Sequence, residues 1–321
     1  MTKTCSWHVL PLAALLLGSC SSGAGGDKAG AGTEETKKIT GRTPFDPVIG
    51  IKYYEVKRRF STGLSFNELG FQQEPSWIIR FKSRDTVEAY SPQYDRMQSF
   101  YLHYDHGDVY NFAKEWFRIK KVTKDSLVFQ RLHLTAREIS KDVRSDVNLT
   151  WYAEDYISKV LKTSVEKLQE PTRADTLYIR KLAEKTNRNP DNRDSAFGAR
   201  QPVEFIPVSK LIKVARISSV DKLLGKTEAY DYLFPRYRID IAKAYADFGY
   251  DFSAVVDAKG RMHLGTFHTN FPENQEPRKK TLTAIIEVYL THLLEVVPGK
   301  TLGIPHSSEI NLSVTGRKNS K

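Results

Sequence analysis

The clearest constraint on the fold is the strict alternation of apolar and polar residues near the C-terminus, over positions 309–315. Ile310, Leu312 and Val314 share one side of this run, and polar residues take the other side. A period of two is typical of a β-strand with one buried face. The sequence therefore predicts a half-buried strand whose apolar face packs against other elements.

A pair of strands is expected earlier in the same region. Apolar residues alternate with polar ones over 250–256 and again over 262–266. Asp257 and Gly260 lie between these runs, and both residue types favour tight turns. We therefore expect the two runs to pair as a β-hairpin.

A helix is expected between this hairpin and the last strand. Over 282–293, apolar residues recur at every third or fourth position, which is typical of an amphipathic helix. Pro298 and Gly299 end it, because Pro cannot continue a helix and Gly accepts a left-handed exit. We expect one C-terminal domain over 203–316 and a basic tail at 317–321. Between 203 and 249 the pattern leaves two alternatives open: Tyr237, Ile239 and Ile241 indicate a strand, whereas IAKAYADF (241–248) also fits a helix.

This order of elements resembles the C-terminal domain of the TonB family of energy transducers. The resemblance is carried by the helix and by VVDAKGRMHLG (255–265) and VPGKTLGIPHSSEINLSV (297–314). It implies a β-β-α-β domain for packing or partner binding. The chain shows neither the membrane-spanning helix nor the Pro-rich spacer of a transducer, so force transmission is not implied. We expect the last strand to lie at a sheet edge and to accept a partner strand, with Glu309, Asn311 and Ser313 at the contact.

The N-terminus has the pattern of an export signal over residues 1–19, with an apolar run over 9–18. Residues 17–20, LGSC, resemble the lipobox of bacterial lipoproteins. This resemblance implies that Cys20 becomes the first residue of the mature chain and carries acyl chains such as palmitate. The alternative is that Cys20 only lies near an ordinary cleavage site. In the lipoprotein pattern, Ser21 in place of an Asp favours the outer membrane.

The lipobox resemblance implies an outer-membrane lipoprotein that faces the periplasm, with the cell surface as the alternative. Residues 20–44 are rich in Gly, Ala, Ser and charge without periodicity, so we expect a flexible tether. Four three-residue segments consist of Asp, then Ser or Thr, then an apolar residue. They resemble the motif that is glycosylated in exported Bacteroidetes proteins, which implies an origin in that phylum. They lie at 85–87, 125–127, 175–177 and 194–196.

Short apolar alternations over 45–150 predict an antiparallel β domain, either an open sheet or a small barrel. Residues 115–130, EWFRIKKVTKDSLVFQ, resemble the closing hairpin of lipocalin-like domains. If this domain encloses a pocket, the chain would carry a small apolar ligand, and this is the alternative function. The aromatic residues expected to line that pocket are Trp77, Tyr90, Phe100 and Trp116.

A helical period begins near Ala153 and predicts a helical connector over 151–202. Its polar, turn-rich end over 187–202 marks the expected domain boundary. The predicted fold class is therefore α+β: an N-terminal antiparallel β domain, a helical connector and a C-terminal TonB-like β-β-α-β domain.

Charge and cysteine content exclude several classes of protein. The formal net charge is +11, but basic residues are scattered beside acids and no aromatic-basic ladder is present, so we expect no nucleic acid. The basic surface is either simply solvated or attracted to anionic envelope material. Cys5 and Cys20 are the only cysteines, so the folded part has no disulfide and no Cys-based zinc site.

Candidate catalytic and metal sites are sparse. Residues 103–108, HYDHGD, suit a turn better than a metal site, because the two His would lie on opposite faces of a strand. No phosphate-binding or dinucleotide motif occurs. A carboxylate pair for hydrolysis would have to come from Asp85, Asp105, Asp108, Glu115 and Asp125.

These patterns together predict a non-enzymatic envelope lipoprotein that binds or scaffolds another envelope component through its C-terminal domain. The expected partners are the lipid bilayer, through the acylated Cys20, and an envelope protein or an anionic glycan. No catalytic residue, cofactor or metal is expected. The alternatives are the apolar-ligand carrier and an envelope hydrolase.

Overall fold

The computed structural model describes residues 44–136, 138–140, 145–218, 220–221, 226–227 and 229–318. Within this chain, residues 38–321 form one compact unit. The predicted export signal, the lipidation site at Cys20 and nearly all of the predicted tether lie outside the described residues, and so does the end of the basic tail.

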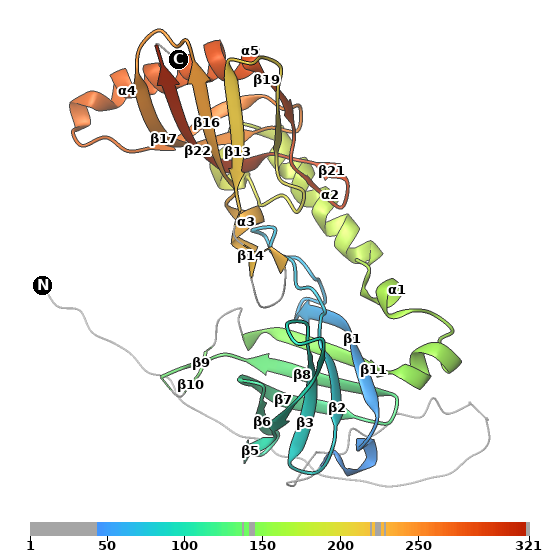
Figure 1. Ribbon diagram of the computed structural model, residues 1–321. Helices are drawn as coiled ribbons and strands as arrows, with labels where there is room; N and C mark the ends of the chain where they lie inside the picture. The colour runs from blue at the N-terminus through green and yellow to red at the C-terminus, as the bar shows by residue number, and fades with distance from the viewer. Residues whose placement is uncertain are drawn as a thin grey trace, which may run out of the picture. The chain divides into compact units, whose positions relative to one another are not determined.

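The N-terminal half forms a nearly closed, nine-stranded antiparallel sheet (Figure 1). Neighbouring strands follow the order β4-β3-β2-β1-β11-β8-β7-β6-β5. β1 and β11, the first and last strands of this half, pair with each other in the middle of the sheet. The strands are β1 (Lys52–Phe60), β2 (Ile78–Phe81), β3 (Thr86–Ser91), β4 (Arg96–Tyr101), β5 (His103–His106), β6 (Val109–Phe112), β7 (Glu115–Val122), β8 (Ser126–Leu132) and β11 (Val147–Ala153).

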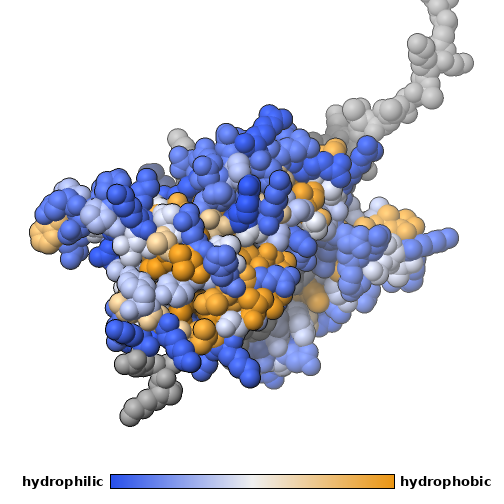
Figure 2. Space-filling view, turned by 90° about the horizontal axis from the view of Figure 1, so that it is seen from above, coloured by the Kyte–Doolittle hydropathy of each residue, from blue (hydrophilic) through white to orange (hydrophobic). Residues whose placement is uncertain are grey.

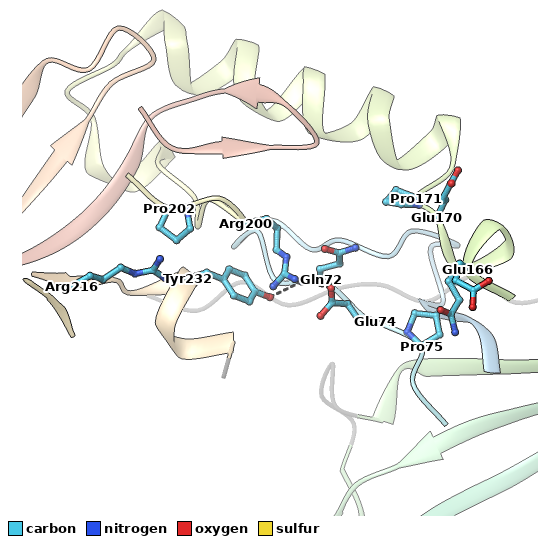
Figure 3. Close-up of a pocket in the computed structure, with 11 residues that line it drawn as sticks. Gln72, Glu74, Pro75, Glu166, Glu170, Pro171, Arg200, Pro202, Arg216 and Tyr232 are labelled. Carbon is cyan, nitrogen blue, oxygen red and sulfur yellow. Dashed lines mark hydrogen bonds and ion pairs between the residues drawn. The ribbon is translucent and has the colours of Figure 1, made fainter. Parts of the chain in front are cut away.

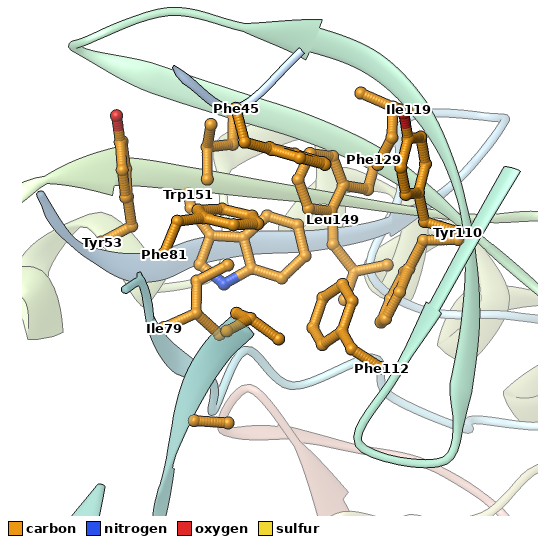
Figure 4. Packing of buried hydrophobic residues seen from close by; sticks show 14 of the residues in the cluster. Phe45, Tyr53, Ile79, Phe81, Tyr110, Phe112, Ile119, Phe129, Leu149 and Trp151 are labelled. Carbon is orange, nitrogen blue, oxygen red and sulfur yellow. The ribbon is translucent and has the colours of Figure 1, made fainter. Parts of the chain in front are cut away.

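Aromatic rings fill the interior of this sheet (Figure 4). Phe45, beside the 3₁₀ turn η1 (Asp46–Val48), stacks on Phe81 with ring centroids 4.2 Å apart. The rings of Phe129 and Trp151 lie 4.9 Å apart. Each such pair contributes about 0.5–1.5 kcal/mol beyond the burial of its area, so these rings fix how the strands pack. A small pair of strands, β9 (Leu134–Thr135) and β10 (Glu138–Ile139), follows β8.

Helices follow β11, beginning with the π-helical turn η3 (Tyr156–Val160) and α1 (Val165–Gln169). The longer α2 (Arg173–Arg188) starts with a capping box, in which Thr172 and Asp175 satisfy each other's backbone N–H groups. Its buried side packs on Phe66 and Phe197, and the 3₁₀ turn η4 (Arg193–Ser195) lies after it. α2 is therefore part of a packed core and not a free linker.

The C-terminal half contains a five-stranded sheet with the order β13-β16-β22-β17-β18. Central β22 (Ser308–Arg317) runs parallel to β16 and antiparallel to β17. Ile310, Leu312 and Val314 point into the core, as their alternation predicts. The other strands are β13 (Ile212–Ile217), β16 (Arg236–Ala242), β17 (Phe248–Val256) and β18 (Met262–Phe267).

One continuous helical segment packs on the buried face of this sheet (Figure 1). It comprises α4 (Gln275–Ala284), the π-helical turn η6 (Ile285–Leu290) and α5 (Thr291–Leu293). Leu282 and Leu290 pack in the same core as Ile310 and Val314. The remaining elements are β12 (Glu204–Pro207), β14 (Val220–Asp221), β15 (Lys226–Thr227), α3 (Ala229–Leu233), η5 (Pro272–Asn274), β19 (Leu294–Val297), β20 (Lys300–Thr301) and β21 (Ile304–Pro305).

The predicted α+β class with a helical connector is wrong. The chain is mostly β, with 43% strand and 24% helix. The reason lies partly in 203–249, where the pattern left a strand or a helix open around 237–248 but the fold forms three strands, β12, β13 and β16. In addition, the predicted connector begins inside β11, and its longest helix buries Ile179 in a core.

Exposed apolar side chains are present in the C-terminal half, and Figure 2 shows one face on which apolar residues lie among hydrophilic ones. Val208, Tyr245 and Val288 are among those that stay more than half exposed. No helix within the described ranges is long and apolar enough to cross a membrane.

Candidate functional site

A cleft of about 650 Å³ lies where five separate stretches of the chain meet (Figure 3). We call it the Arg200 cleft. Its volume falls within the usual range for a site that binds a small molecule or a peptide segment. It is lined by Gln72, Glu74, Pro75, Glu166, Gln169, Glu170, Pro171, Arg200, Pro202, Arg216 and Tyr232.

The side chain of Arg200 is held in a defined position in the cleft. Its guanidinium lies 4.2 Å from the ring centroid of Tyr232, and one nitrogen is 2.7 Å from Oε1 of Glu74. Its backbone N–H donates to Oγ1 of Thr301 at 3.2 Å. A stacked, planar guanidinium keeps several donors in fixed directions, which suits recognition of a carboxylate or phosphate.

Tyr232 forms the platform beneath Arg200. Its ring, on α3, is buried, and its hydroxyl oxygen accepts a hydrogen bond from the backbone N–H of Gln72 at 3.0 Å. Burial raises the pKa of Tyr232, so the phenol stays neutral at physiological pH. The residue therefore ties α3 to the segment that carries Glu74.

A close backbone approach brings that segment to Arg200. The N–H of Gly198 donates to the carbonyl oxygen of Leu69 at 2.9 Å. Gly70 has a φ of +82°, and a Cβ there would lie 2.3 Å from the Gly198 oxygen. Only glycine fits position 70, so this contact depends on the absence of a side chain.

The opposite wall is formed by α1 and by Glu170 and Pro171, which lead into α2, and Asp175 in the first turn of α2 anchors it. Its buried carboxylate accepts from the N–H of Ser65 at 2.7 Å and from Thr172, and pairs with Arg59 at 3.0 Å. Burial alone would raise the pKa of Asp175, but these hydrogen bonds and the Arg59 guanidinium lower it to about 2. Asp175 therefore stays ionised and joins the helical wall to the β domain.

Opposite charges occupy the two ends of the cleft (Figure 3). Arg216 lies toward one end and donates to the carbonyl oxygen of Asp231 at 3.2 Å. Glu166 and Glu170 lie at the other end. Hydrogen bonds from the backbone N–H of Glu166 and from Ser164 lower the pKa of the Glu166 carboxyl, so this group is ionised at neutral pH. This arrangement suits a polar ligand that carries charge of both signs.

The residues proposed for hydrolysis from the sequence do not meet in this cleft, and none of those five carboxylates lines it. In the described part of the chain, no group of three or more His, Cys, Asp or Glu residues could hold a metal ion. The HYDHGD segment forms all of β5 and the turn that follows it, in which Gly107 has a φ of +55°, and β6 begins at the next residue.

The four aromatic residues suggested as a ligand pocket have separate roles. Trp77 packs edge-on against Phe112 and Phe117 in the core. The Tyr90 hydroxyl donates to Asp95 at 2.6 Å, Phe100 is half-buried against the core, and the Trp116 ring lies 6.2 Å from that of His103. The cavity beside Trp77 is about 30 Å³, which is room for about one or two water molecules.

The predicted edge position of the last strand is wrong. Both sides of β22 are already paired, so no partner strand can add to it. Glu309, Asn311 and Ser313 instead lie on the sheet face opposite the core, where Glu309 pairs with Arg193 at 2.7 Å.

No sequence pattern singles out the residues of the Arg200 cleft. Arg200 lies in the stretch interpreted as a polar domain boundary, and Tyr232 lies in the region without a clear pattern. No local motif marks either one, because the cleft forms only through contacts between residues far apart in the chain. No protein-family model matches this chain, and no curated protein is similar enough to match it.

Proposed function

We propose that this chain is a non-enzymatic, lipid-anchored protein of the bacterial envelope that binds another envelope component in the Arg200 cleft. Acylation at Cys20 would confine it to a membrane surface, where two acyl signals give stable anchoring. The support for the anchor is the LGSC segment and the apolar run before it.

The observation that carries the binding proposal is the fixed guanidinium of Arg200. A surface arginine normally samples many conformations, but this one is stacked on a buried tyrosine and paired with Glu74. A donor that is already ordered loses little entropy on binding, which favours affinity. The neighbouring Arg216 and the glutamates at the far end add charge of both signs.

The binding proposal is tested by comparing what co-purifies with the native protein and with Arg200→Ala after mild solubilisation of envelope membranes. Arg278→Ala is a matched control, because Arg278 stacks on Tyr250 at a similar 4.4 Å but lies outside the cleft. We expect Arg200→Ala to lose a partner that Arg278→Ala retains. Identical partners for all three proteins would contradict the proposal.

The anchor is tested separately by Cys20→Ala. We expect this variant to leave the membrane fraction, because it lacks the thiol that carries the diacylglyceryl group. Continued membrane fractionation after a high-salt wash would refute the lipid anchor.

A further inference from the structure

The exposed face of α2 carries an unusual concentration of positive charge. Over its 16 residues, the helix exposes five cations and a single acid, Glu184. The cations are Arg173, Arg180, Lys181, Lys185 and Arg188.

These charges form one stripe along the helix. The exposed residues of α2 that include these charges recur at three- and four-residue spacing, which places them on one side of the helix. They are at positions 173, 177, 180, 181, 184, 185 and 188. The opposite side is buried through Asp175, Ile179, Ala183 and Thr186. The stripe is about 24 Å long at 1.5 Å per residue.

None of the five cations pairs with an acid among the described residues, although the chain forms many ion pairs elsewhere. Five cations beside each other repel, so this face gains stability from an anionic partner. Leu177 lies within the stripe and is 51% exposed, so the stripe also has an apolar contact point.

We propose that the α2 stripe, the surface formed by these five cations and Leu177, docks on an anionic lipid bilayer. A basic helix face with an exposed apolar residue binds at the headgroup level, where long Lys and Arg side chains reach the phosphates. The stripe has no aromatic residue on which nucleic acid bases could stack. Docking does not require the acyl anchor or the Arg200 cleft.

The test uses the chain from position 20 onward with Cys20→Ala, so that no acyl group contributes. Binding is measured by co-sedimentation with vesicles of phosphatidylglycerol and phosphatidylcholine in equal parts. We expect binding that weakens as salt is added and that is lost on pure phosphatidylcholine vesicles. The double variant Arg180→Glu with Lys181→Glu removes two cations, and each cation contributes about fivefold to partitioning onto an anionic surface. We therefore expect its partitioning onto the vesicles to fall by at least about 25-fold.

Lys279→Glu with Lys280→Glu is the matched control, because it changes net charge equally at two exposed lysines of α4. We expect this control to reduce partitioning by less than about threefold. Equal losses in the two double variants would mean that only net charge matters and would overturn the proposal, as would no binding to anionic vesicles.

A second readout locates the contact. The test protein begins after Cys5 and carries Cys20→Ala, so it has no native thiol. A thiol introduced by Leu177→Cys is therefore its only one and can carry a polarity-sensitive dye. We expect a blue shift on anionic vesicles at position 177 but not at Val288→Cys, which is comparably exposed at 58%. Tight binding to a soluble anionic glycan such as alginate, without that shift on vesicles, would overturn the lipid assignment.

Discussion

The guanidinium of Arg200 stacks 4.2 Å above the ring of Tyr232, a residue 32 positions away in the sequence that belongs to a different element. We predict that Arg200→Ala changes the free energy of unfolding by about 1 kcal/mol or less, because both Arg200 and Glu74 are partly exposed. Partner binding should nevertheless fall sharply. Denaturant unfolding beside the co-purification assay separates the two effects.

Arg200→Lys refines this prediction. Lysine keeps the positive charge beside Glu74 but cannot stack as a plane or donate in a fork. We expect partial loss of binding, between the native protein and Arg200→Ala. Full retention in Arg200→Lys would show that charge alone is recognised and that the stacked geometry is irrelevant.

Asp175→Asn should destabilise the protein by about 3 kcal/mol. The substitution removes a fully buried carboxylate that pairs with Arg59 and caps α2, and it leaves Arg59 without its counter-charge. Asp191→Asn changes an exposed aspartate in the following loop and serves as the control. Urea unfolding measures both, and equal stability of the two variants would contradict the role of Asp175.

Stability should depend on the buried His306 at mildly acidic pH. Burial lowers the pKa of His306 to about 4 from an ordinary 6.5, while a hydrogen bond to the Ser307 carbonyl opposes this shift. As the pH drops below 6.5, the imidazole of His306 is therefore protonated in the unfolded chain before it is protonated in the folded chain. The free energy of unfolding falls as pH drops from 6.5 toward 4. The loss attributable to His306 is about 3 kcal/mol.

Urea unfolding across this pH range checks the prediction. Because carboxylates also titrate near its lower end, the comparison is between variants. His306→Gln should flatten the slope, whereas His268→Gln, at an exposed position, should retain it. An unchanged slope in His306→Gln would show that another group is responsible.

Leu312→Asp and Ser313→Asp test the orientation of β22. Leu312 is 2% exposed and pairs across the strands with Tyr237 and Phe252, so a charge there should prevent stable folding. Ser313 points to the opposite face of the same strand, so its replacement should be tolerated. Thermal unfolding followed by circular dichroism distinguishes the two, and a stable Leu312→Asp would contradict the register.

Local elements were predictable from the sequence where the pattern was strong. The alternation of Ile310, Leu312 and Val314 predicted β22, and Asp257 with Gly260 predicted the turn between β17 and β18. Both follow from side-chain periodicity and turn chemistry, which are properties of a few adjacent residues.

The position of an element within its sheet was not predictable in the same way. The last strand was expected at an edge, but β16 pairs with it in parallel, and the sequence pattern left open whether the residues of β16 form a strand or a helix. The Arg200 cleft was missed for a related reason. Gln72, Arg200 and Tyr232 meet only because Gly70 and Gly198 let two backbones approach closely, and this contact has no local signature.

Site-specific photocrosslinking shows whether the Arg200 cleft holds an envelope component in the cell. A photoreactive phenylalanine analogue replaces Glu166, which lines the cleft, or Glu276, an exposed glutamate on α4 outside it. We predict a discrete adduct from position 166 in intact cells, no such adduct from position 276, and loss of the adduct when Arg200→Ala is added. An adduct pattern that is the same at both positions, or that persists without Arg200, would contradict binding of a partner in the Arg200 cleft.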